Sequence, residues 1–180
     1  MDPAVLRTEL WLPRPRAEVF PFFADARNLQ AITPRWLSFE VLTQGPLEMR
    51  QGLLIDYRLR IRGFPIRWQT RIEVWEPPHR FVDLQLRGPY RLWRHEHCFE
   101  EKDGGTLCRD VVEYAAPGGP FRGLIERWFV RPDVDRIFQY RADTLKWLFP
   151  AAGIRSPRVA AGGLRGAAPE QGGGLSTCRG

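Results

Sequence analysis

The sequence has little cysteine and no long apolar run. Its three cysteines, Cys98, Cys108 and Cys178, are an odd number without a Cys-x-x-Cys spacing, which argues against a disulfide framework and against a cysteine zinc site. No stretch approaches the roughly 18 to 20 apolar residues that a membrane span needs. Met1–Pro3 has neither the basic nor the apolar region of a secretory signal. We therefore expect a cytoplasmic protein in a reducing compartment, without stable membrane insertion.

The sequence also lacks a glycine loop of the phosphate-binding type. Gly104 and Gly105 stand in a turn between two strand patterns, and Gly172–Gly174 lies in a low-complexity tail. The net charge is +6, but the arginines before residue 150 alternate with apolar residues or stand beside acids. That arrangement is typical of solvated arginines rather than of a binding stripe. The sequence thus predicts no cofactor and no nucleic-acid partner, and it makes no prediction of the oligomeric state.

The remaining composition is that of one globular domain followed by a tail. Of the 180 residues, 43% are hydrophobic and 27% are charged, which suits an ordinary core. Residues 150–180 are rich in Gly, Ala and Arg and have almost nothing to bury. We expect residues 1–149 to form the domain and residues 150–180 to be a disordered tail.

The hydrophobic pattern changes twice along the domain. A strand pattern over 5–12 is followed by two short helical patterns over 17–32, and from 37 to 114 apolar and polar residues alternate with a period of two. Beyond residue 120 an apolar stripe at three- and four-residue steps predicts one long helix to 148, with a kink at Pro132. The economical arrangement is an α+β helix-grip fold, in which a curved antiparallel sheet wraps around the last helix. Such a fold tends to leave a cavity between sheet and helix.

Several segments resemble one superfamily over residues 4–149. They are Val19-Phe20-Pro21-Phe22-Phe23-Ala24-Asp25, Ile32-Thr33-Pro34-Arg35-Trp36, Phe81-Val82-Asp83-Leu84-Gln85, Trp93-Arg94-His95-Glu96-His97 and Ile137-Phe138-Gln139-Tyr140-Arg141. With them the chain resembles the START-like (Bet v 1-like, helix-grip) superfamily and, within it, bacterial polyketide cyclase/dehydrase-type ligand-binding proteins of the SRPBCC group. The resemblance implies the helix-grip fold and the binding of a hydrophobic small molecule in an interior cavity.

The hairpin around Asp103 and Gly104 carries the sharpest local prediction. An Asp-Gly pair favours a two-residue turn, and that turn sets Lys102 opposite Gly105. Continuing this register along the two strands brings four pairs of residues together on one face. The pairs are Phe99 with Cys108, His97 with Asp110, His95 with Val112, and Trp93 with Tyr114. The aromatic members indicate that this face is the inner one.

Three interpretations of these polar residues are open. In the first, His95, His97 and Asp110 form a polar floor that satisfies buried groups and contacts a bound ligand. In the second, Asp110 orients His97 and raises its pKa, so that the pair acts as an acid and base in a cyclase or dehydratase. In the third, the same three residues bind a metal; we adopt no metal site, because adjacent histidines on a strand commonly pack beside aromatic rings.

We expect the protein to bind a hydrophobic or aromatic small molecule, lipid- or polyketide-like, between the sheet and the final helix. An enzymatic role stays open, and a module that only holds a protein partner is the further alternative; it would have a collapsed interior. Asp83 and Gln85 are weaker site residues, because Val82, Leu84 and Leu86 alternate with them and are more apolar. The predicted ligand-binding residues are Tyr57, Trp68, Asp83, Gln85, Trp93, His95, His97, Phe99, Asp110 and Tyr114.

Overall fold

The computed structural model describes residues 2–151. The strands are β1 (Ala4–Leu12), β2 (Glu40–Val41), β3 (Leu54–Ile61), β4 (Phe64–Glu76), β5 (Arg80–Arg87), β6 (Leu92–Lys102) and β7 (Gly105–Ala115). The helices are α1 (Arg16–Phe23), the 3-10 turns η1 (Ala26–Gln30), η2 (Arg35–Leu37) and η3 (Gly119–Phe121), α2 (Arg122–Ile125), the π-helix η4 (Glu126–Val130) and α3 (Arg131–Leu148). Most of the expected tail lies outside the described residues.

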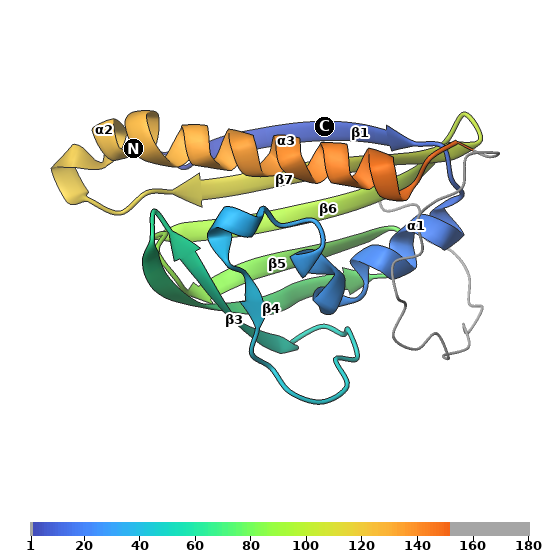
Figure 1. Ribbon diagram of the computed structural model, residues 1–180, viewed down its shortest axis with the longest axis horizontal. Helices are drawn as coiled ribbons and strands as arrows, with labels where there is room; N and C mark the ends of the chain where they lie inside the picture. Colours follow the sequence, from blue (N-terminus) through green and yellow to red (C-terminus); the bar gives the residue numbers. More distant parts are fainter. Residues whose placement is uncertain (1, 152–180) are drawn as a thin grey trace.

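All seven strands form one sheet, in the order β1-β7-β6-β5-β4-β3-β2, and every neighbouring pair of strands is antiparallel. Figure 1 shows α3 lying along β7 and β1 while the rest of the sheet curves away beneath it. The short helices α1, η1 and η2 follow β1 and lie on the same side of the sheet as α3. This is the predicted helix-grip arrangement of α+β class.

The register of the β6–β7 hairpin is the predicted one. Lys102 pairs with Gly105, and the pairing continues through His97 with Asp110. Asp103 and Gly104 both have positive φ, at 51° and 74°, as a two-residue turn of this kind requires. Because the turn is local, its residues determine the pairing of two strands of eleven residues each.

The residues of β5 that point to the interior are not the predicted ones. The alternation favours Val82, Leu84 and Leu86 as interior residues, but Phe81 and Asp83 line the interior, and Leu86 is exposed. Val82 is buried on the other face, where its partner is Glu96. Regular pairing with β6 sets Phe81 opposite His97 and Asp83 opposite His95, so the facing of β5 follows from its neighbour and not from its own apolar alternation.

The last helix is less regular than predicted, and the irregularity lies before the proline. The π-helix η4 ends at Val130, and Pro132 occupies the first turn of α3, where its missing N–H breaks no helical hydrogen bond. From there α3 buries Val134, Phe138, Arg141 and Leu145 at helical spacing. Three of these four side chains are apolar and belong to the core clusters that join α3 to the sheet.

Two further findings concern the sequence predictions. Cys108 is a buried free thiol in the core, as predicted. Within residues 2–151, no helix combines the length and apolarity that crossing a membrane requires.

Candidate functional site

A cavity of about 660 Å³ lies between the concave face of the sheet and the helices. Strands β3 to β6 form one wall, α3 and η4 form the opposite wall, and α1, η1 and η2 contribute a third side. Most of its lining side chains are aliphatic or aromatic. The volume falls in the range of roughly 300 to 1,000 Å³ that is typical of small-molecule sites.

Six of the ten predicted ligand-binding residues line this cavity. They are Tyr57, Trp68, Asp83, Trp93, His95 and His97. The other four are Gln85, Phe99, Asp110 and Tyr114, which are not among the lining residues. Phe99 and Tyr114 are buried in core clusters, and Gln85 donates a hydrogen bond to the carbonyl of Tyr90 at 2.7 Å. The predicted set therefore overlaps the cavity wall but extends farther along the strands than the cavity does.

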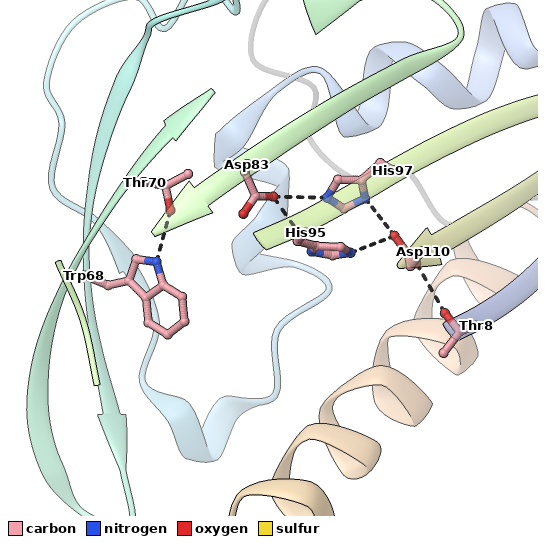
Figure 2. Close-up of polar contacts among 7 residues, drawn as sticks. All are labelled: Thr8, Trp68, Thr70, Asp83, His95, His97 and Asp110. Carbon is pink, nitrogen blue, oxygen red and sulfur yellow. Dashed lines mark hydrogen bonds and ion pairs between the residues drawn. The ribbon is translucent and has the colours of Figure 1, made fainter. Parts of the chain in front are cut away.

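Four of the polar residues form what we call the His–Asp cluster: Asp83, His95, His97 and Asp110. Figure 2 shows the two imidazoles between the two carboxylates, with Asp83 on the β5 side and Asp110 on the β7 side. His95 Nε2 donates to Asp110 Oδ1 at 2.9 Å, and His97 Nε2 donates to Asp83 Oδ2 at 3.2 Å. His97 Nδ1 lies 2.8 Å from Asp110 Oδ1, but at an angle unsuited to a hydrogen bond.

Asp110 belongs to the outer layer of this cluster. It contacts both histidines, and its Oδ2 accepts a hydrogen bond of 3.5 Å from Thr8 on β1. Because it does not line the cavity, Asp110 orients His95 and His97 without touching that space. Asp83, which the sequence ranked below the alternating apolar residues, is the carboxylate that faces the cavity.

The electrostatics of the cluster shift the pKa values of the two histidines in opposite directions. Burial lowers the pKa of both. For His97 the close negative charges of Asp110 and Asp83, with the hydrogen bond to Asp83, outweigh burial, so its pKa is raised above 6.5. For His95 burial and the positive charge of His97 prevail, so its pKa is lowered. Burial opposes ionisation of Asp83 and Asp110, but the histidines hold the pKa of both carboxyl groups below 3.8. The cluster therefore holds two carboxylates and favours one imidazolium, at His97.

Aromatic rings form the wall next to this cluster. Trp93 lies 5.4 Å from Trp68 and 4.9 Å from Tyr90 between ring centroids. Trp68 donates from its indole N–H to Thr70 Oγ1 at 3.0 Å, which satisfies the one polar atom of that ring (Figure 2). The cavity thus offers flat apolar surface on one side and hydrogen-bonding groups on another.

Arg141 is a buried charged residue of the cavity wall, and the sequence drew attention to it only as the last residue of a segment that resembles the superfamily. Its side chain is buried, and it lines the cavity from α3. A signal was present, because Arg141 stands three residues after Phe138 and four before Leu145, on the apolar stripe of the helix. An arginine at such a position must either pair or face a polar space.

Three residues of the cluster also offer potential metal ligands. One ligand atom from each of Asp83, His95 and His97 lies within 4.8 Å of the others. Asp83 thus takes the place that the sequence interpretation gave to Asp110. Each histidine already has a carboxylate partner, which accounts for the arrangement without an ion.

A curved sheet that encloses an apolar cavity against a long C-terminal helix defines the START-like, helix-grip class. The family model described as polyketide cyclase/dehydrase and lipid transport matches residues 12–139. The chain therefore belongs to this family. No curated protein is similar enough to count as a match.

Solved structures show the same fold at low sequence identity. Protein CV1439 of Chromobacterium violaceum is 16% identical, with a TM-score of 0.63 over 81% of this chain and 96% of that one. TTHA0849 of Thermus thermophilus is 21% identical, with a TM-score of 0.56 over 79% and 91% of the two chains. The major latex-like protein 151 of Panax ginseng is 9% identical, with a TM-score of 0.58 over 82% and 97%. These similarities establish the fold alone.

Proposed function

We propose that the protein binds a hydrophobic or aromatic small molecule, lipid- or polyketide-like, in the cavity between the sheet and α3. The observation that carries this proposal is the 660 Å³ space with its mainly apolar lining. The family description, which names polyketides and lipids, supports the same class of ligand. The alternative, a module that only holds a protein partner, predicted a collapsed interior, and a cavity of about 660 Å³ supports ligand binding over it.

Trp68 provides the test of where the ligand sits. Replacing Trp68 with alanine removes an indole that lines the cavity and contacts Trp93 and Tyr90. We expect this variant to bind the uncharged fluorescent probe N-phenyl-1-naphthylamine about ten-fold more weakly, because aromatic contact and buried apolar area are lost together. Titration of the probe fluorescence measures the change.

The matched control is Trp147→Ala. Trp147 lies on α3 but is 58% exposed and does not line the cavity. Its replacement should leave the probe affinity within about two-fold of the original chain, and thermal melting checks that both variants are folded. Equal losses in the two variants, or no binding of the probe to the original chain, contradict the proposed site.

Proton transfer on the bound molecule is a second candidate function. His97 lines the cavity and lies between Asp83 and Asp110, which is the arrangement of a general acid or base. A suitable test substrate is 2-acetonaphthone, an uncharged aromatic ketone. If the chain has this activity, it will speed the replacement of the methyl hydrogens of this ketone by deuterium from deuterated water. His97→Gln and Asp110→Asn should then keep the affinity for the ketone but lower the exchange rate at least ten-fold. Exchange no faster than in buffer would leave binding as the whole function.

A further inference from the structure

Arg141 carries a positive charge into the cavity without a protein partner. Its side chain projects from α3, and the residue is only 9% exposed. Among residues 2–151 its guanidinium forms no ion pair and no hydrogen bond, and the Nε atom is buried without a partner. The other arginines that line the cavity lie near exposed surface: Arg62 pairs with Asp133, and Arg136 lies over the Trp36 ring at 4.9 Å.

Packing alone does not account for this side chain. Its one described favourable contact is the Phe138 ring, whose centroid lies 5.0 Å from the guanidinium carbon, a usual cation–π separation. Burial lowers the pKa of Arg141, and the charges of Asp110 and Asp83 only partly offset that effect. A guanidinium stays protonated in proteins and has five N–H donors, so it requires acceptors. The cavity is where an acceptor can reach it.

The charges around Arg141 decide which acceptor fits. Phe138 contacts both Arg141 and His95, and the charges of Asp110 and Asp83 act on the guanidinium, so Arg141 belongs to the same end of the cavity as the His–Asp cluster. Asp83 and Asp110 contribute two negative charges there. Arg141 balances one of them, and an imidazolium at His97 balances the other. With His97 neutral, this end of the cavity is negative; with His97 protonated, it is neutral.

In neither state is a positive charge left over for an anion. With His97 neutral, a carboxylate brought beside Arg141 would gain one favourable charge and meet two unfavourable ones, at Asp83 and Asp110. With His97 protonated, the favourable and unfavourable charges cancel, and the carboxylate would still lose its hydration on burial. A carbonyl oxygen would accept from the same N–H groups without that repulsion. The remaining charged lining residues do not alter this balance, because they carry two charges of each sign: Asp25, Asp133, Arg62 and Arg136.

We infer that Arg141 anchors the uncharged carbonyl oxygen of an otherwise apolar or aromatic ligand, and that the cavity discriminates against the corresponding carboxylate. This inference rests on the proposed function, because it names the polar group of the molecule that occupies the cavity. It runs against the usual expectation that a buried arginine in a binding site receives an acid. The ligand class is therefore that of aromatic or aliphatic ketones and esters rather than free acids.

Three naphthalenes of nearly equal shape provide the test: 2-acetonaphthone, 2-ethylnaphthalene and 2-naphthoate. Each displaces N-phenyl-1-naphthylamine from the full chain at neutral pH, and the displacement curves give relative affinities. The ketone should bind about ten-fold more tightly than the hydrocarbon, because a hydrogen bond to a charged donor forms, and about ten-fold more tightly than the carboxylate. In Arg141→Met the ketone should lose its advantage over the hydrocarbon, while the hydrocarbon binds as before.

Lys146→Met is the matched control, since it removes a positive charge from an exposed position of the same helix outside the cavity. It should leave all three affinities unchanged. Tighter binding of 2-naphthoate than of the ketone, or equal binding of ketone and hydrocarbon in the original chain, would overturn the inference. So would a ketone advantage that survives in Arg141→Met. If neither the probe nor 2-ethylnaphthalene binds, the proposed function itself is wrong, and the inference fails with it.

Discussion

Replacing Asp110 with alanine is expected to lower the free energy of unfolding by about 3 kcal/mol. The change removes the oxygen that lies 2.9 Å from His95 Nε2 and 2.8 Å from His97 Nδ1, and the two buried imidazoles then lose a charged partner. Chemical denaturation measures the loss. Asp135→Ala, at an exposed position of α3, should change the same quantity by less than about 0.5 kcal/mol.

The stability difference between the original chain and Asp110→Ala should decrease both toward acidic pH and toward basic pH. The pKa of Asp110 is lowered below 3.8 in the folded chain, so its contribution is present above that value and is lost as the pH falls through the folded pKa. The pKa of His97 is raised above 6.5, so its contribution is present below that value and is lost as the pH rises through the folded pKa. The stability difference between the original chain and Asp110→Ala should thus be largest between about pH 4 and 6.5. A difference that keeps growing above that window contradicts the charge pairing.

Replacing Arg141 with methionine is expected to stabilise the unliganded protein by about 2 kcal/mol. The lowered pKa of Arg141 means that its surroundings as a whole oppose the charge, and methionine keeps most of the apolar length of the side chain. For a chain of this size, the melting temperature should rise by roughly 4 to 8 °C. The same variant loses its preference for a ketone, so stability and ligand recognition are opposed at this position.

Lys146→Met separates this effect from a general reduction of positive charge. Lys146 is exposed in the last turn of α3, where its charge is favourable to the helix, so its replacement should leave the melting temperature unchanged or slightly lower. If Arg141→Met melts below the original chain, Arg141 is a structural residue whose hydrogen-bonding demand is met within the protein, and no ligand oxygen is needed to explain it.

The parts of the fold that the sequence predicted are those set by local chemistry. The Asp103-Gly104 turn determines the β6–β7 register, and this register alone is enough to place His97 opposite Asp110. The period of two that the sequence shows over residues 37–114 likewise holds in β3, where Ile55, Tyr57 and Leu59 are all buried. Such short-range signals predict the structure correctly because they do not depend on how distant elements pack against one another.

The parts that the sequence missed depend on how distant elements meet. Asp83 faces the cavity because β5 pairs with β6 so that Asp83 lies opposite His95, and the residues of β5 alone do not encode this pairing. Arg141 was not among the predicted site residues because a charged residue on a helix is usually solvated, whereas the curvature of the sheet encloses this one. Gln85 was included because it belongs to a segment that resembles the superfamily, but its amide donates a hydrogen bond to the Tyr90 carbonyl and does not line the cavity. Both Asp83 and Arg141 lie where a polar group interrupts an apolar pattern, and such interruptions tend to mark functional positions.

A crystal structure of the full chain grown with 2-acetonaphthone tests the central claim most directly. We predict that the naphthalene ring lies between the Trp68 wall and α3, with its carbonyl oxygen within hydrogen-bond distance of the Arg141 guanidinium. Two results would contradict this claim. In one, the ketone binds on the surface and the side chains of the protein fill the cavity; in the other, Arg141 pairs with a carboxylate of the protein.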